Sequence, residues 1–384
     1  MQRIASRMQV LLCLVLLPFL HTNAFSPPFH PTNWPLHTAG CRTRGRLGSA
    51  IECLRMSGGE GEGKYAASFE SVQQAAERIK GAAHYTPIMT SEALDRMSGK
   101  SLVFKCENFQ KMGAFKFRGA WNAVTKYMDE GGRGPIVTHS SGNHAQAVAK
   151  VCGIKGIESH IVMPNNAPQV KVDAVAEYGA NIIRCGDLPR DRADKADEVA
   201  AQHPGCFLMP SYNHPDVMSG QGTLMLELIE QAGEPLDAVI VPVGGGGMLS
   251  GCCLAAKGLR PDIRIFGAEP LGADDAARSL KEGKMLEQTG PKTIADGLRT
   301  GLGTLTWPVI RDNVEDILTV TEDEIVAAMR LVYMRMKIVI EPSAAVGVAV
   351  ALSDKFRSIE GISRVGVVIC GGNTDLDDLP WVKK

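Results

Sequence analysis

Short runs rich in β-branched residues alternate with longer amphipathic segments along most of this chain, from about residue 64 onward. Strands and helices in alternation form parallel sheets covered by helices, so the sequence predicts an α/β fold. In such folds ligands bind at the carboxyl ends of the strands, and the loops that follow strands are the places to expect chemistry. Eight strands are expected, at residues 102–106, 136–139, 160–163, 181–185, 238–243, 263–268, 317–320 and 365–370.

Helices are expected in most of the gaps between these strands, for example at residues 216–232, 248–258 and 321–336. The last of these segments starts with a T-x-x-E capping box formed by Thr321 and Glu324. In a capping box each side chain accepts a hydrogen bond from the backbone amide of the other residue, which fixes the start of the helix.

The chain has 384 residues, enough for two domains or one large one. Residues 61–384 are interpreted as one folded body. Two compact strand–helix units lie within residues 133–210, and we interpret this range as a smaller subdomain inserted in the larger sheet.

The charges of the chain nearly cancel, with 41 Lys and Arg against 42 Asp and Glu and a net charge of -1. No broad electrostatic field would draw such a chain to nucleic acid or to an anionic membrane. The composition therefore favours a small-molecule substrate.

The first 60 residues have the composition of a leader. Arg3 and Arg7 precede an apolar run at residues 10–20, so residues 1–24 predict a signal peptide; eleven apolar residues are too few to cross a bilayer of ~30 Å. Residues 25–60 begin with a long acid-free, Arg-containing stretch and are interpreted as a transit-like disordered leader. Such a two-part leader predicts the plastid of an alga with complex plastids; the secretory pathway and the cytoplasm are the alternatives.

The cysteines do not form a disulfide or zinc framework. Three of the ten lie in the leader, the remaining seven are an odd number, and none are spaced C-x-x-C. Several lie inside apolar runs, which is typical of small buried hydrophobic residues in a reducing compartment.

The strongest chemical signal is the tetraglycine loop, residues 244–247, which follows the apolar strand LDAVIVPV and precedes a helix that starts at Met248. Four glycines allow the backbone to turn its N–H groups toward an anion at a helix N-terminus, which predicts a phosphate site. Leu249 and Ser250 stand where a dinucleotide fingerprint needs its third glycine, and no Gly-Lys-Ser/Thr of a Walker loop follows. A tight turn that binds no ligand is the remaining alternative.

A second loop, THSSGNHAQ at residues 138–146, also lies between a strand and a helix. Its hydroxyls, amide and backbone N–H groups are suited to hold a carboxylate. A single histidine such as His144 is more often a packed or capping residue than a catalyst, so the prediction depends on the cluster.

A third element, FQKMGAFKFRGAWNAV at residues 109–124, places Lys116 at the start of a predicted helix among apolar neighbours. Such surroundings lower the pKa of an amine, as formation of a Schiff base requires. Most lysines are solvated surface charges, and Lys116 alone would be weak evidence. Beside a phosphate loop it suggests pyridoxal 5'-phosphate (PLP), whose aldehyde reacts with a lysine.

Eight sequence blocks occur in the order and approximate spacing that one known family shows. They are FKFRGA, SSGNHAQ, SGQGT, PVGGGGMLSG, EPLGADD, TIADGL, EPSAAVG and CGGNTDL. On these blocks the chain resembles the fold type II, or β-family, PLP enzymes, in the branch of serine racemases and serine/threonine dehydratases, from about residue 68 to residue 377. The resemblance implies two parallel-sheet αβα domains of the tryptophan synthase β-like type, with the active site between them.

The resemblance also implies roles for individual residues. Lys116 would be the Schiff-base lysine, Phe115 would pack beside the PLP ring, and Cys370 would face the pyridine nitrogen, where racemases usually have serine. A thiol is a weak donor and acceptor, so the ring nitrogen is expected to stay neutral, which favours racemisation or β-elimination over transamination. The phosphate would be held by Gly244, Gly245, Gly246, Gly247 and the N–H of Met248. The substrate carboxylate would be held by Ser140, Ser141, Asn143 and His144, with Asn143 also contacting the ring hydroxyl.

The block EPLGADD resembles the divalent-cation site of the racemases. Glu269, the carbonyl of Ala273 and Asp275 would bind Mg²⁺, or Ca²⁺ or Mn²⁺, together with waters. A helix N-terminus that merely carries acids is the alternative. The resemblance further implies a homodimer and possible activation by ATP. Ser91 and Lys111 match the nucleotide site of the racemases, whereas Glu92 and Met112 weaken the match.

The activity expected from the resemblance is racemisation of serine, with α,β-elimination of serine to pyruvate and ammonia as a side activity. Racemisation requires a second acid/base on the face opposite Lys116, and Ser141 supplies it where the dehydratases resemble SAGNHAQ, with alanine. A threonine/serine ammonia-lyase is the alternative, and a non-catalytic PLP-binding protein is disfavoured by Lys116. Tyr212 and Arg192 lie where family members differ, so the preferred amino acid stays open.

Overall fold

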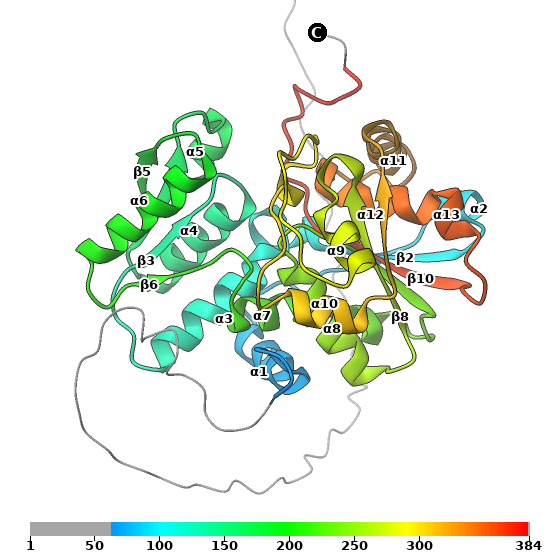
Figure 1. Ribbon diagram of the computed structural model, residues 1–384, viewed down its shortest axis with the longest axis horizontal. Coiled ribbons are helices and arrows are strands. Elements are labelled where there is room, and N and C mark those ends of the chain that lie inside the picture. Colours follow the sequence, from blue (N-terminus) through cyan, green and yellow to red (C-terminus); the bar gives the residue numbers. More distant parts are fainter. Residues whose placement is uncertain (1–62, 383–384) are drawn as a thin grey trace, which may run out of the picture. The chain divides into compact units, whose positions relative to one another are not determined.

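The computed structural model describes residues 63–382, and the expected signal and transit segments at residues 1–60 lie outside this range. Within the described range, no helix is both long and apolar enough to cross a membrane. The described chain contains two β-sheets, each covered by helices (Figure 1).

The larger sheet consists of β1 (Ile88–Met89), β2 (Ser101–Cys106), β7 (Ala238–Pro242), β8 (Arg264–Pro270), β9 (Asp316–Val320) and β10 (Arg364–Ile369). Their order is β1–β2–β10–β7–β8–β9, and every pair is parallel except β1 with β2. Strands β2, β7, β8 and β10 are buried along nearly their whole length. Continuous burial is typical of parallel strands that have helices on both faces of the sheet.

The smaller sheet has four parallel strands in the order β5–β4–β3–β6. Its strands are β3 (Ile136–His139), β4 (Ser159–Pro164), β5 (Asn181–Cys185) and β6 (Phe207–Leu208). Helices α4 (Asn143–Lys155), α5 (Gln169–Glu177) and α6 (Pro189–Gln202) lie with it, on the left of Figure 1. These elements occupy residues 136–208, inside the range 133–210 assigned to the smaller subdomain.

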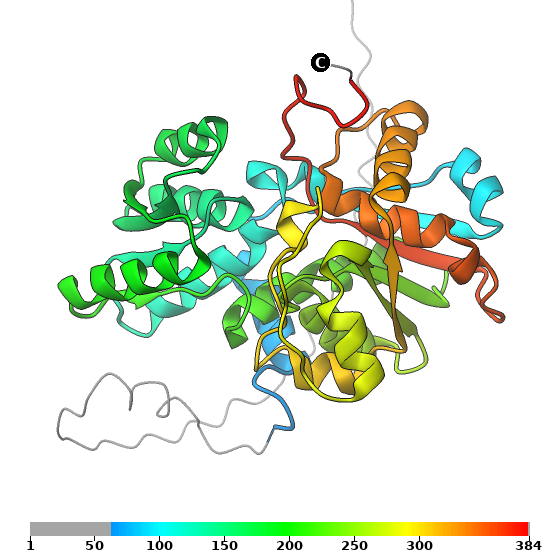
Figure 2. The same ribbon diagram turned by 45° about the horizontal axis from the view of Figure 1, so that its top comes forward.

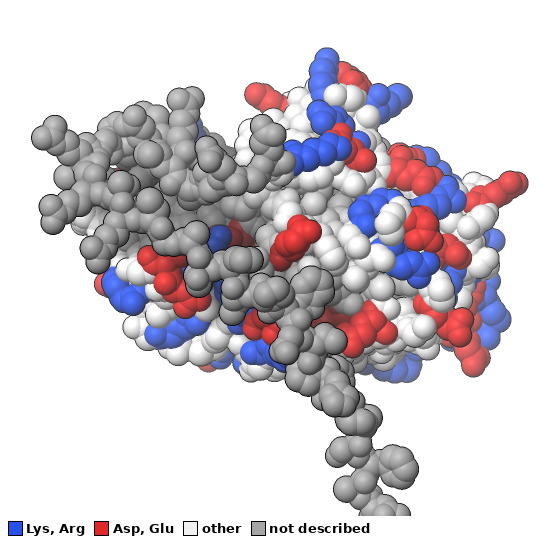
Figure 3. Space-filling model, turned by 90° about the horizontal axis from the view of Figure 1, so that it is seen from below, with Lys and Arg blue, Asp and Glu red and all other residues white. Residues whose placement is uncertain are grey.

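The remaining helices, except α3 (Lys116–Asp129), accompany the larger sheet (Figure 2). They are α1 (Phe69–Ile79), α2 (Glu92–Ser98), α7 (Pro215–Gln231), α8 (Gly247–Leu259), α9 (Asp275–Glu282), α10 (Trp307–Asn313), α11 (Glu322–Arg335), α12 (Pro342–Leu352) and α13 (Asp354–Arg357). Helix α3 packs on α4, α7 and α1, and its buried apolar side chains belong to the core of the smaller sheet. Helix α12 packs on β7, β8, β9 and β10 and is buried from Ser343 to Ala351. On the face shown in Figure 3, Lys and Arg side chains are interspersed with Asp and Glu side chains.

Helix α7 crosses α3 and α8 at very short distances because glycines meet at both crossings. A Cβ atom at Gly220 would lie 2.6 Å from the Cα of Gly119 in α3. A Cβ atom at Gly222 would lie 2.5 Å from the carbonyl oxygen of Gly251 in α8. The SGQGT block is therefore explained by packing: its glycines allow the helix that begins at Lys116 and the helix that follows the tetraglycine loop to lie on one common helix.

All eight predicted strands are present, with ends that differ from the prediction by at most two residues. The capping box is confirmed, since the Glu324 amide donates to Thr321 Oγ1 and the Thr321 amide donates to Glu324 Oε2. The seven described cysteines are free, and all but Cys206 are buried, as predicted. Strands β1 and β6 were not predicted, because each has only two residues and forms by pairing with a longer neighbour.

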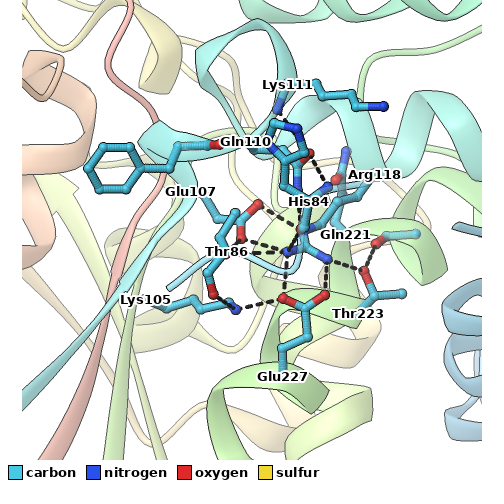
Figure 4. A network of polar contacts seen from close by, with 12 residues as sticks. His84, Thr86, Lys105, Glu107, Gln110, Lys111, Arg118, Gln221, Thr223 and Glu227 are labelled. Atoms are coloured by element: carbon cyan, nitrogen blue, oxygen red, sulfur yellow. Dashed lines mark hydrogen bonds and ion pairs between the residues drawn. The ribbon is translucent and has the colours of Figure 1, made fainter. Parts of the chain in front are cut away.

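A buried network of charges joins β2, α3 and α7 (Figure 4). The guanidinium of Arg118 donates to both carboxylate oxygens of Glu107 at 2.8 Å and to both oxygens of Glu227 at 2.6 and 2.8 Å. Lys105 donates to Glu227 at 2.6 Å, and Thr86 donates to Glu107. Burial alone would raise the pKa of Glu107, but the charge and hydrogen bonds of Arg118 outweigh it and hold the pKa below its ordinary value. Two cations thus neutralise two carboxylates.

Replacing Arg118 with methionine tests how far this network stabilises the fold. The variant keeps an apolar stem but leaves the fully buried Glu107 carboxylate without its guanidinium. We expect the free energy of unfolding, measured by urea denaturation, to fall by about 3–5 kcal/mol. Among the described residues Arg357 forms an ion pair with the exposed Asp354 alone, so Arg357→Met is the control and should unfold near the parental midpoint. Equal midpoints for the two variants would contradict the stabilising role of the network.

Candidate active site

Lys116 is the first residue of α3, and its side chain turns toward the chain that follows β6. Its Nζ donates to the Ser211 carbonyl at 2.7 Å and lies 5.2 Å from the centre of the Phe115 ring. The surrounding protein desolvates the ammonium and lowers the pKa of Lys116 to about 8, although Glu341 and Cys370 act in the opposite direction. The predicted decrease in the pKa of this lysine is therefore present.

The loop before Lys116 is attached to the loop after β10. The Phe115 amide donates to the Cys370 carbonyl at 3.1 Å, and the Gly372 amide donates to the Gly113 carbonyl at 2.8 Å. Ala114 and Gly371 form an isolated antiparallel bridge between these bonds. Cys370 thereby lies beside Lys116, and burial raises the pKa of its thiol, which stays neutral.

Glu341, the residue before α12, is a site residue that the sequence reasoning did not single out. Its carboxylate accepts two hydrogen bonds of 3.0 Å from the Asn143 side chain and one of 3.2 Å from the Asn373 amide, and the Cys370 sulfur lies 4.0 Å from one of its oxygens. Burial raises its pKa to about 7. The signal in the sequence was a single acid directly before a helix that has no other charged residue.

The loop that follows β3 contributes Ser140, Ser141, Asn143 and His144. Asn143 begins α4, and besides its bonds to Glu341 it accepts a hydrogen bond of 2.8 Å from Asn373. Ser140 and Ser141 are half-buried in the turn before the helix. His144 is buried and lies 3.1 Å from the Thr138 hydroxyl; burial lowers its pKa to about 3, so it is a neutral hydrogen-bonding group.

The tetraglycine loop connects β7 to the start of α8, and all four glycines are buried. Gly246 has a φ of +86°, which favours glycine. A Cβ atom at Gly245 would lie 2.5 Å from the Tyr212 ring, and one at Gly247 would lie 2.8 Å from the Tyr212 Cβ. Residues 211 and 212 therefore connect the loop to Lys116, because Ser211 accepts the hydrogen bond of the lysine and Tyr212 packs on the glycines.

The residues predicted for a cation lie at the end of β8 and just after it: Glu269 is in the strand, and Ala273 and Asp275 follow it. Glu269 and Asp275 are fully buried, and Ala273 lies between them in a 3-10 turn, Leu271–Ala273. Glu269 accepts from the Ala276 and Ala277 amides at 3.1 and 2.9 Å, and Asp275 accepts from Gln288 and the Leu302 amide at 2.7 and 3.0 Å. Burial raises the pKa of Glu269 to about 9 and that of Asp275 to about 6.

The structure thus brings Lys116, Cys370, Asn143 and the glycine loop together around Glu341 and Tyr212, and it places the acidic pair nearby. Asp275 is bonded to Leu302, and the next residue, Gly303, donates to the Gly245 carbonyl at 3.2 Å. Arg192, on α6, lies near His139 at the end of β3.

The low pKa of Lys116 can be measured through the capture of PLP by the cofactor-free chain. Only the neutral amine attacks an aldehyde, so the capture rate should rise about tenfold per pH unit below pH 8 and level off above it. An ordinary lysine, with a pKa near 10.4, would continue to gain rate up to that pH. Stopped-flow absorbance between pH 6 and 10 measures the profile. Lys116→Ala is the control, and a rate that still rises at pH 10 would contradict the lowered pKa.

The chain is similar to proteins with known activities. The serine racemase of Arabidopsis thaliana is 49% identical over 319 residues, which cover 82% of this chain and 96% of that protein. The beta-hydroxyaspartate dehydratase of Paracoccus denitrificans is 46% identical over 317 residues, which cover 83% of this chain and 99% of that protein.

The solved structure of maize serine racemase aligns with a TM-score of 0.79 at 47% identity and covers 82% of this chain and 95% of that one. This confirms the predicted α/β fold with two parallel sheets. The family model of pyridoxal-phosphate dependent enzymes matches residues 79–371. The chain therefore belongs to the family of pyridoxal-phosphate dependent enzymes.

Proposed function

We propose that this protein interconverts L- and D-serine and, as a second activity, eliminates serine to pyruvate and ammonia. The observation that carries the proposal is Lys116, an amine of lowered pKa at the start of α3, on a chain that has a serine at position 141. The identity of 49% to the serine racemase of A. thaliana supports it.

The residues of the site fit the PLP that the family uses. Glycines at positions 244–247 leave no side chain between the backbone and a phosphate, and the N-terminus of α8 favours a negative charge. Lys116 would carry the cofactor, Phe115 would pack beside its ring and Asn143 would reach the ring hydroxyl. When bound, PLP supplies a sink for the electron pair left at the α-carbon after its proton is removed.

Two residues would move protons in racemisation. With a pKa of about 8, Lys116 has a neutral fraction near neutral pH that can accept the α-proton of L-serine from one face. Inversion then needs a proton from the opposite face, and we assign its donor as Ser141. Elimination of the β-hydroxyl needs no second base, so both activities share their first step.

Cys370 would hold the pyridine nitrogen as a neutral thiol, because burial raises its pKa. A neutral pyridine ring withdraws electron density less strongly than a protonated one, which favours racemisation and elimination over transamination. The Glu341 carboxylate would fix the Asn143 side chain through its two hydrogen bonds.

A second candidate activity is elimination from 3-hydroxyaspartate or threonine as the main reaction. The identity of 46% to the beta-hydroxyaspartate dehydratase of P. denitrificans favours it. Both candidates use Lys116 in the same way and differ in their need for Ser141 and in the preferred side chain of the substrate.

We also propose that Glu269, Asp275 and the Ala273 carbonyl bind Mg²⁺, or Ca²⁺ or Mn²⁺. Burial raises the pKa of both carboxylates, and the charge of Asp275 raises that of Glu269 further, so a bound cation would stabilise their charged forms. Among the described residues, no group of three or more His, Cys, Asp or Glu side chains could hold a metal, so a carbonyl and waters would complete this set. The ion would supply positive charge beside the loop that supports Gly245.

Three further expectations remain proposals: a homodimer, activation by ATP near Ser91 and Lys111, and delivery to a plastid by residues 1–60.

The assignment of Ser141 predicts that Ser141→Ala separates the two activities. Formation of pyruvate from L-serine should be retained, because it needs only Lys116. Interconversion of L- and D-serine, and elimination from D-serine, should fall by ~10²- to 10⁴-fold, the usual loss when one acid/base is removed. A chiral product assay with L-serine, D-serine, L-threonine and 3-hydroxyaspartate measures both.

Ser140→Ala is the matched control: it removes a neighbouring hydroxyl that would bind the substrate carboxylate, so it should lower racemisation and elimination by the same factor and leave their ratio at the parental value. If Ser141→Ala racemises serine at the parental rate, Ser141 only binds the substrate carboxylate and is not the second acid/base. A parent that never forms D-serine would favour the ammonia-lyase.

The proposed cation predicts that a chelator lowers the thermal midpoint of the holoenzyme and that Mg²⁺ restores it, because an ion bound only by the native state stabilises it by mass action. Asp275→Asn should abolish this response. Asp274→Asn should keep it, since Asp274 is instead paired with Arg278 at 2.8 Å. If a chelator lowers the thermal midpoint of Asp275→Asn as much as that of the parent, the proposed cation site is wrong.

A further inference from the structure

Thr306 is a buried residue whose side chain binds the carbonyl of Gly245, the second glycine of the tetraglycine loop. The Thr306 hydroxyl donates to the Gly245 carbonyl oxygen at 2.8 Å, and the Gly303 carbonyl, a second acceptor, lies farther away at 3.1 Å. The same hydroxyl accepts the Gly303 amide at 3.0 Å, and that amide also lies 3.2 Å from the Gly245 oxygen. Thr306 has no exposed surface and precedes the first turn of α10.

The direction of this carbonyl decides where the next amide points. In a planar trans peptide the C=O and N–H bonds point to opposite sides. The bond from Thr306 to the Gly245 oxygen therefore turns the Gly246 N–H away from Thr306. Without it, rotation of the peptide could place the carbonyl dipole, with its negative end, where an anion should bind.

Contacts of Gly246 and Gly247 hold the loop in the position in which the Gly245 carbonyl accepts this hydrogen bond. A Cβ atom at Gly246 would lie 2.7 Å from the Thr306 hydroxyl and from the Ile310 side chain, so α10 covers that side closely. The Tyr212 ring packs against Gly245 and Gly247. The Gly246 carbonyl is bonded to the Ser250 amide at 2.8 Å, and the Gly247 carbonyl to the Ser250 hydroxyl at 3.2 Å. Three successive carbonyls are thus occupied by protein donors.

We infer that Thr306 is a positioning residue for the phosphate of the cofactor: its hydroxyl fixes the Gly245–Gly246 peptide so that the amide, and not the carbonyl, faces the phosphate. The inference rests on the proposed binding of PLP by the glycine loop. Thr306 itself would not touch the cofactor.

The test compares PLP with pyridoxal, which has the same ring and aldehyde but no phosphate. The full chain is stripped of cofactor and reloaded with each aldehyde, and the dissociation constants are measured by absorbance. Thr306→Val removes the hydroxyl at nearly constant volume. Its dissociation constant for PLP should rise about five- to tenfold, the effect of one neutral hydrogen bond, while that for pyridoxal stays at the parental value. Thr306→Ser retains the hydroxyl and should restore the preference for PLP.

Ser98→Ala is the matched control. Its hydroxyl is also buried, accepts the Lys100 amide at 3.1 Å and donates to carbonyls at 3.0 and 3.1 Å, but it lies at the end of α2. This variant should bind both aldehydes as the parent does, even if its thermal midpoint falls.

The outcomes separate the two proposals. Equal affinity of the parent for PLP and pyridoxal would overturn phosphate binding by the glycine loop. A parent that prefers PLP, together with a Thr306→Val variant of unchanged preference, would overturn only the role of Thr306. If Thr306→Val weakens the binding of PLP and of pyridoxal by the same factor, Thr306 has a general packing role, and this result would also overturn its role in positioning the phosphate. If Thr306→Val does not fold, loss of the preference in Thr306→Ser would refute the role of the hydroxyl.

Discussion

The ion pair between Arg118 and Glu107 is the constraint on which the rest of the site depends. Both side chains are fully buried, and Arg118 lies two residues after Lys116 in α3. A shift of α3 relative to β2 or α7 would separate buried charges, which is far more costly than a shift of an apolar contact. The first turn of α3 is therefore held by Glu107, the residue directly after β2, and by Glu227 of α7. A reactive amine needs such rigid support to meet its substrate in one geometry.

Parallel strands then bring distant segments to this amine. The loops after β3, β7 and β10 lie at carboxyl ends of strands, and they contribute Asn143, the four glycines and Cys370. The Glu341 carboxylate connects two of these loops, because Asn143 and Asn373 both donate to it. The negative charge of Glu341 also acts on the lysine. Burial lowers the pKa of Lys116, and the Glu341 carboxylate opposes part of that decrease. Desolvation therefore lowers the pKa of Lys116 and raises that of Glu341, so that both lie close to neutral pH.

The sequence predicted the longer elements of the fold and the loops of the site for physical reasons. Buried parallel strands are continuous apolar runs, so their position was visible, while β1 and β6 exist only through pairing with β2 and β3. Lys116 and the glycine loop were found because each carries a local signal. Glu341 and Thr306 were missed, since their importance comes from partners 198 residues away in Asn143 and 61 residues away in Gly245. Burial and long-range hydrogen bonds of this kind leave no local pattern.

In the proposed reaction the position of Ser141 affects the two directions unequally. Ser141 lies in the turn just before α4, a helix of 13 residues whose N-terminus favours negative charge. A serine that has given up its proton is negative, so this position makes the hydroxyl a better proton donor. The same field makes the resulting alkoxide a weaker base. Ser141 must donate when L-serine is inverted but must accept a proton when D-serine reacts. The helix therefore favours L-serine over D-serine as the substrate of elimination, because only the reaction of L-serine starts at the desolvated amine of Lys116.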